Sequence, residues 1–268
     1  MAVPSTSPAL PAPAVRKLRV YAFDPHASLT LGSAKYSHAV ISLPWSDPAN
    51  PELSPGPVNA YLEVIDVDPT SGQFYEPIDL DAREVLGDHG LTPSEGDPRF
   101  HQQMVFAVIM KTILLFERAL GRKVLWAPVW DAKAKTYVPT PRLRVYPHAL
   151  REANAYYSPE KRALLFGYFK SDARAAGASW VFTALSHDII VHEATHAILD
   201  GVHRRYAEPT SRDSLARLRL PGPARRPPRS ILALERAGAS VRRRDFRTQR
   251  LAGFYQRGSG PGPSRYGR

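Results

Sequence analysis

Three residues in the stretch "VHEATH" have the types and the spacing of a metal-dependent hydrolase site: His192, Glu193 and His196. Two histidines four residues apart on a helix lie one above the other on the same face, so both imidazoles can bind one ion. A glutamate directly after the first histidine lies beside that ion, where it can accept a proton from an activated water molecule. The pattern therefore predicts a Zn²⁺ site with His192 and His196 as metal ligands and Glu193 as the general base.

The residues around this motif predict the helix that positions it. The run "DIIVHEATHAIL" has apolar residues at helical spacing, which predicts a half-buried helix over about residues 184–200. Thr183 or Ser186 can cap its start, and Gly201 follows its last turn. The alternative is a half-buried helix whose two histidines and glutamate are satisfied by local hydrogen bonds, with no metal.

Asp188 and His203 are the nearest candidates for supporting roles. Asp188 lies one turn before His192 on the same face, so it can accept a hydrogen bond from the ligand's other ring nitrogen and orient it. Its alternative role is that of an acid stabilised by the helix dipole. His203 is seven residues beyond His196, about 10 Å along a continuing helix, which is too far to share one ion. We therefore expect His203 to be a surface residue.

The preceding sequence predicts strands and one strongly apolar helix. Residues 1–15 form a proline-rich leader, which we expect to be disordered. A strand is predicted in "RKLRVYAFDP", a hairpin around the turn residues "PTSG", and a buried helix that starts at Asp97-Pro98 and stops at Gly121. Further strands are predicted in "KVLWAPVW", "TYVPTPRLRVYP" and "ANAYYSPEKRALLFGYF".

Composition restricts the partners and the compartment. The net charge is +11, but residues 211–268 contain 15 arginines, no lysine and three acidic residues, so the preceding 210 residues sum to −1. Any binding of anionic partners therefore depends on the tail, whose few aromatic residues disfavour nucleic acid as a partner. There is no cysteine, which excludes disulfides and thiolate metal sites. The most apolar run, "MVFAVIMKTILLF", is too short to span a bilayer, so we expect a cytoplasmic protein with no membrane contact.

Beyond the motif, the chain resembles bacterial metallopeptidases of the thermolysin-like, or gluzincin, type. The resemblance covers about residues 16–210, and it is carried by "HEATHAILDGVHRRYAEPT", "GPVNAYLEVIDVDP" and "GLTPSEGDPRFHQQMVFAVIMKT" among other segments. It implies an α+β thermolysin-like fold with a β-rich N-terminal part, a zinc-binding helix and peptide or protein substrates. It also implies that "NAYY" is an edge strand, in which Asn154 and Ala155 align the substrate.

The chain departs from the family where the third zinc ligand should follow. The family carries that ligand, a glutamate, on a second helix, but here no acidic residue occurs between Asp213 and Glu235, and Pro221, Pro223, Pro227 and Pro228 exclude a regular helix. Glu208, Asp213 and Glu235 are the conceivable substitutes. The helical C-terminal part is therefore expected to be missing or disordered. We hypothesise that residues 211–268 are partly out-of-frame translation, because composition changes abruptly where the family-like sequence stops.

Two other functions stay open from the sequence. One is a catalytically dead scaffold, and the other is a binding protein whose Arg-rich tail contacts anionic partners. If the helical part is missing, we expect Ile189, Ile190, Ala197 and Ile198 to form an exposed apolar face on the zinc helix. The sequence does not determine the oligomeric state.

Overall fold

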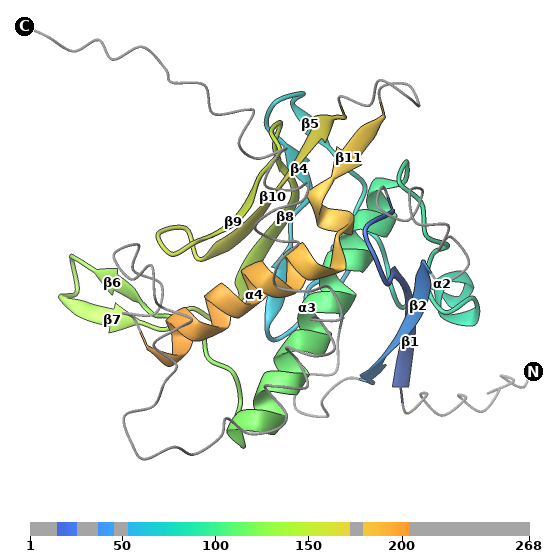
Figure 1. Ribbon diagram of the computed structural model, residues 1–268. Helices are drawn as coiled ribbons and strands as arrows, with labels where there is room; N and C mark the ends of the chain where they lie inside the picture. The colour runs from blue at the N-terminus through green and yellow to red at the C-terminus, as the bar shows by residue number, and fades with distance from the viewer. Residues whose placement is uncertain (1–14, 26–36, 46–52, 172–178, 204–268) are drawn as a thin grey trace, which may run out of the picture.

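The computed structural model describes residues 15–25, 37–45, 53–171 and 179–203 (Figure 1). They form a mixed α+β arrangement with few helices and several small sheets. This confirms the α+β class predicted from the sequence. The predicted tail at 211–268, the substitute ligands Glu208, Asp213 and Glu235, and all of the leader except Val15 lie outside the described residues.

The long apolar helix α3, Pro98–Leu120, is the centre of the core (Figure 1). It begins and ends as its sequence predicts: the Asp97 side chain accepts a hydrogen bond from the Arg99 amide, and Gly121 closes the helix in the left-handed conformation at φ 68°. Residues 100–110 are all buried, because the hairpin of β1 and β2 packs on one side of the helix and the main sheet packs on another. The sequence prediction of a helix buried on most sides is confirmed.

The main sheet is mixed, with order β11-β10-β8-β3 and with β9 also paired to β10. Strands β3 and β10 run parallel to β8, whereas β9 and β11 run antiparallel to β10. Residues 163–166 of β10 pair with β9 and residues 168–170 pair with β11, so the two short strands follow each other along one edge. The bounds are Leu62–Val64 for β3, Leu143–Leu150 for β8, Ala155–Ser158 for β9, Ala163–Lys170 for β10 and Trp180–Phe182 for β11.

Smaller elements complete the described chain. Three antiparallel hairpins and one short helix are present: β1 (Val15–Tyr21) with β2 (His38–Pro44), β4 (Val67–Asp68) with β5 (Gln73–Phe74), β6 (Val129–Asp131) with β7 (Thr136–Val138), and α2 (Arg83–Gly87). The hairpin predicted around "PTSG" is the one that β4 and β5 form. Within these ranges, no helix has both the length and the apolar character needed to cross a membrane.

Helix α4, His187–Val202, carries the histidine motif and packs against α3. The 3-10 turn η2, Thr183–Leu185, leads into it. Ser186, one of the two expected capping residues, takes the N-cap position, but its side chain makes no capping hydrogen bond. The Thr183 hydroxyl instead accepts from the amide of Gly167 in β10 and donates to its carbonyl. Gly201 lies inside the last turn rather than after it.

The apolar face of α4 is covered, which corrects the expectation of an exposed face. Ile189, Ile190, Ala197 and Ile198 are all buried and belong to the same core cluster as the residues of α3. The long apolar helix and the sheet provide this cover within the described residues.

Candidate metal centre

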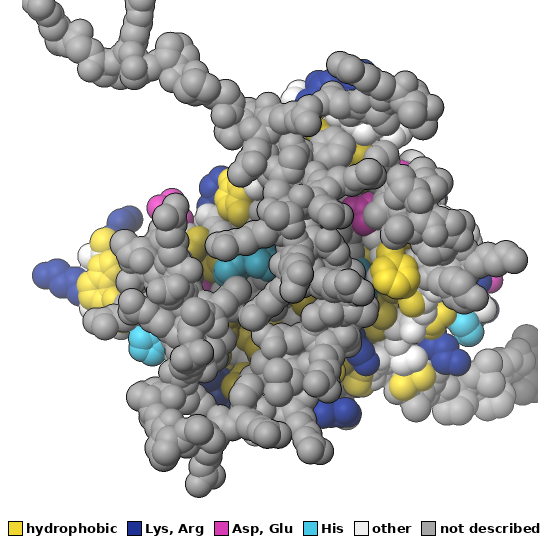
Figure 2. Space-filling view, in the orientation of Figure 1, with side chains coloured by type: hydrophobic (Ala, Val, Ile, Leu, Met, Phe, Trp, Pro, Cys, Tyr) yellow, Lys and Arg dark blue, Asp and Glu magenta, His cyan; other side chains and the backbone are white. Residues whose placement is uncertain are grey.

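Helix α4 places His192 and His196 side by side, as the four-residue spacing predicts. Their Nε2 atoms lie 3.1 Å apart, and the rings are close to perpendicular, with centroids separated by 4.7 Å. His192 is exposed and His196 is half-buried. Histidine side chains are visible near the middle of the face over which α4 runs (Figure 2). Because His192 is exposed, a ligand could reach this pair from solvent.

The pair fits a divalent cation. Two imidazole nitrogens bound to one tetrahedral zinc are separated by about 3.4 Å, given zinc–nitrogen bonds of about 2.1 Å. The separation of 3.1 Å in the chain is close to this value. Partial burial lowers the pKa of both rings, and for His196 the neighbouring His192 lowers it further, which favours the neutral form that can donate a lone pair. Without a metal, the same distance allows one ring to donate a hydrogen bond to the other.

Glu193 is on the adjacent side of the helix and faces the sheet. Its Oε2 atom accepts a hydrogen bond of 3.0 Å from the backbone amide of Tyr157 in β9. Burial raises the pKa of Glu193 to about 7, and the Tyr157 amide partly opposes this rise. The carboxyl group of Glu193 is thus held against β9, on the helix that carries the histidine pair.

Strand β9 presents one free edge to this site. The Tyr157 amide points away from β10, because it bonds Glu193. Residues two apart in a strand have the same orientation, so the amide and carbonyl of Ala155 also point outward. Within the described residues, the outer edge of β9 has no strand partner, which is the arrangement that the "NAYY" resemblance implies. Asn154 precedes the strand, and its side-chain amide donates to Glu152 at 3.2 Å.

Asp188 and His203 lie on α4 and at its end. Asp188 is half-buried, burial raises its pKa, and no hydrogen bond joins it to His192 in the described part of the chain. His203 ends the helix and is exposed, as expected from the sequence.

Among the residues described, no group of three or more His, Asp or Glu side chains is arranged to hold a metal ion.

A buried polar network behind the motif was not predicted from the sequence. The Tyr157 hydroxyl donates to Asp200 at 2.8 Å, and Arg162 approaches the same carboxylate oxygen at 3.4 Å. Arg162 also donates to the carbonyls of Ala127 and Pro128. Asp200 is four residues after His196, so helical spacing alone could have indicated it as a neighbour of the motif. No sequence signal identifies Arg162, which is distant along the chain.

Searches of this sequence and structure against protein-family models, curated proteins and solved structures found no significant match.

Proposed function

We propose that the chain is a zinc-dependent peptide hydrolase with a thermolysin-like, or gluzincin, fold. The observation that supports this proposal best is the convergence of two imidazole nitrogens at 3.1 Å beside a buried carboxyl group. Both features occur on one helix, in the His-Glu-x-x-His pattern of zinc peptidases. The resemblance in sequence adds the expectation of a peptide substrate.

In this proposal, His192 and His196 hold Zn²⁺ through their Nε2 atoms. A zinc ion bound there supplies Lewis acidity and lowers the pKa of water. Glu193 accepts a proton from the attacking water molecule and returns it to the leaving amine as the peptide C–N bond breaks. The Tyr157 amide keeps the carboxylate oriented during this transfer, because it binds one of its two oxygens.

The free edge of β9 provides a place for an extended peptide. The outward amide and carbonyl of Ala155 can pair with a substrate backbone, as a strand added to the sheet. This edge is next to Glu193, because the outward amide two residues further along already bonds that carboxylate. Substrate binding and proton transfer would then take place at adjacent positions of one strand and one helix.

The test is the zinc content of the purified full chain, together with its cleavage of a mixed peptide library. We expect about one zinc per chain, lost in His192→Ala and in His196→Ala and kept in the control His38→Ala, which changes an exposed histidine on β2. Zinc that washes out on dialysis would indicate that the two histidines are the only protein ligands. A folded parent that takes up no zinc would reject the proposal and favour a catalytically dead scaffold.

A further inference from the structure

A second group of titratable residues lies in the core, outside the candidate metal centre. His101 of α3 and His148 of β8 are almost fully buried, and their Nδ1 and Nε2 atoms respectively are 2.8 Å apart. The Nδ1 of His148 is 2.6 Å from Oδ1 of Asp66, which follows β3. At the other end, the Nε2 of His101 is 3.1 Å from the carbonyl oxygen of Glu95. Four groups are thus joined by three consecutive contacts.

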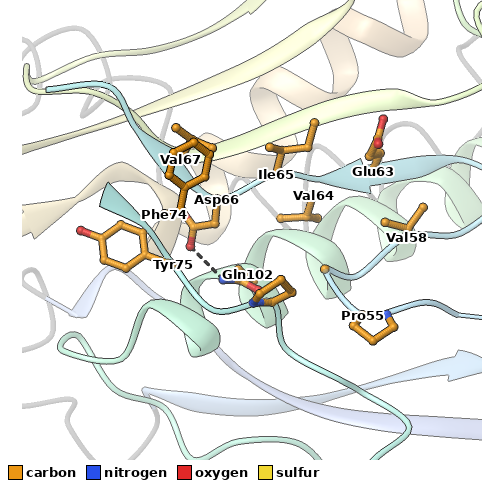
Figure 3. Close-up of a pocket in the computed structure, with 12 residues that line it drawn as sticks. Pro55, Val58, Glu63, Val64, Ile65, Asp66, Val67, Phe74, Tyr75 and Gln102 are labelled. Atoms are coloured by element: carbon orange, nitrogen blue, oxygen red, sulfur yellow. Dashed lines mark hydrogen bonds between the residues drawn. The ribbon is translucent and has the colours of Figure 1, made fainter. Parts of the chain in front are cut away.

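At one end of this chain of contacts the group can only accept, and at the other end the second oxygen of Asp66 is fixed as an acceptor. The Glu95 carbonyl cannot donate a proton, and the other oxygen of Asp66 accepts a hydrogen bond of 3.0 Å from the Gln102 side-chain amide. That amide cannot be turned around, because its oxygen accepts from the Ile78 amide while its nitrogen also donates to the Glu76 carbonyl. Figure 3 shows Asp66 and Gln102 joined in this way beside a pocket that they line together with apolar side chains.

Counting protons then gives the charge of the group. Each of the three contacts requires one proton, but two neutral imidazoles supply only two. The third proton lies between Oδ1 of Asp66 and Nδ1 of His148. We propose that it resides on His148, because an imidazole is a stronger base than a carboxylate. His148 and Asp66 then form a buried imidazolium–carboxylate pair, while His101 stays neutral and donates to Glu95. The contact of 2.6 Å between His148 and Asp66 has the short length of a charge-assisted hydrogen bond.

The surroundings support this distribution of charge. Burial lowers the pKa of His101 to about 3, and His148 lowers it further, so His101 is the neutral member. The other titratable groups near the pair are Tyr75 and Tyr168, whose rings face His148 at 4.9 and 6.1 Å. The Tyr168 hydroxyl is occupied by Asp68, to which it donates at 2.6 Å. Neither phenol is therefore needed as a proton source for the pair.

The third proton connects this pair to the helix that bears the histidine motif. Phe182, the last residue of β11, contacts the ring of His101 edge-on at 4.6 Å and that of His148 at 5.7 Å. The next residues form η2 and then α4. If the proton were lost, two lone pairs would face each other in one of the three contacts, which would weaken the packing of this buried group.

The decisive measurement is the nitrogen NMR spectrum of histidine-labelled full chain at neutral pH, after treatment with a chelator. We expect His148 with protons on both ring nitrogens and His101 with a proton on Nε2 alone. Assignment follows from the signals lost in His148→Gln and His101→Gln. A singly protonated His148, or a His101 that carries its proton on Nδ1, would overturn the proposal.

An Asp66→Asn variant provides a second test. Its amide can donate the third proton permanently, so we expect a folded protein in which His148 is neutral and its unfolding midpoint in urea is close to that of the parent. Asp68→Asn is the matched control. The Asp68 carboxylate accepts from the Thr70 and Ser71 amides and from the Ser71 and Tyr168 hydroxyls, so an uncharged amide there weakens these charge-assisted bonds and the midpoint should fall. Equal loss of stability in both variants would contradict the proton count. If Asp66→Asn does not fold, the parent spectrum still decides.

Discussion

Glu193 is the residue on which the proposed chemistry depends most directly. We predict that Glu193→Gln keeps its zinc and its fold, because a glutamine oxygen can still accept the Tyr157 amide. Cleavage should fall by about 10²- to 10⁴-fold, since an amide cannot take up the proton of the attacking water. Zinc content and peptide cleavage measured on the same preparation check this prediction, with the exposed Glu160→Gln as the control. Cleavage at the parental rate would show that another group is the base.

His101 should make the protein sensitive to acid. Its pKa is lowered to about 3 in the folded chain, whereas an unfolded histidine titrates near 6.5. Below about pH 6.5 the unfolded state therefore binds a proton that the folded state lacks, and stability falls as the pH is lowered towards 3, by up to about 1.4 kcal/mol per pH unit.

Denaturant unfolding at several pH values would measure this effect. His101→Gln should show a shallower loss of stability over the same range, whatever its stability at neutral pH, because the titrating group is gone. His38→Gln, on the exposed start of β2, should keep the parental pH dependence. The prediction is contradicted if the parent and His101→Gln have parallel pH profiles.

At the scale of elements, the end of α4 is fixed by close approach to the chain that follows α3. A Cβ atom added at Gly201 would overlap the carbonyl oxygen of Leu125, a backbone atom that cannot move aside as a side chain can. We predict that Gly201→Ala lowers the free energy of unfolding by about 1–3 kcal/mol, the usual effect of overpacking.

Gly87→Ala is the control for that substitution. A Cβ atom at Gly87, at the end of α2, meets nothing within 4 Å, so the change should be neutral or slightly stabilising. Urea unfolding of the two variants checks the pair of predictions. If Gly201→Ala were as stable as the parent, α4 would not approach the Leu125 backbone this closely.

At the scale of the whole molecule, zinc binding should be coupled to folding. Helix α4 is part of the central core, so unfolding separates it from α3 and disperses the two ligands. Zinc at about 100 times its dissociation constant should stabilise the full chain by about 2.7 kcal/mol. Thermal unfolding with added zinc should show this shift in the parent and in His38→Ala, but not in His192→Ala. An equal shift in all three would place the zinc elsewhere.

The hypothesis about residues 211–268 is tested by the gene. If that region is partly out-of-frame translation, an alternative reading frame across codons 211–245 should encode an amphipathic helix that bears a glutamate. Such a helix would supply the third ligand that the family pattern expects. If neither alternative frame encodes one, the Arg-rich sequence is the protein's own and the hypothesis fails.

The local features of the fold could be predicted from the sequence because they depend on neighbours along the chain. The start and stop of α3 follow from Asp97-Pro98 and Gly121, and the helical spacing of His192 and His196 sets their approach. The α+β class was implied by the resemblance in sequence, and the structure confirms it. The zinc, its third ligand and the peptide substrate stay predictions.

Only the tertiary structure determined which distant groups meet. Nothing in the local sequence pairs Glu193 with the Tyr157 amide, or joins Asp66, His148 and His101 across the core. The tertiary structure also decided that the apolar face of α4 packs against α3 rather than being left open, because packing depends on elements that are far apart in sequence. Periodicity shows that a helix has an apolar face, but the element that covers this face is determined by the arrangement of the whole chain.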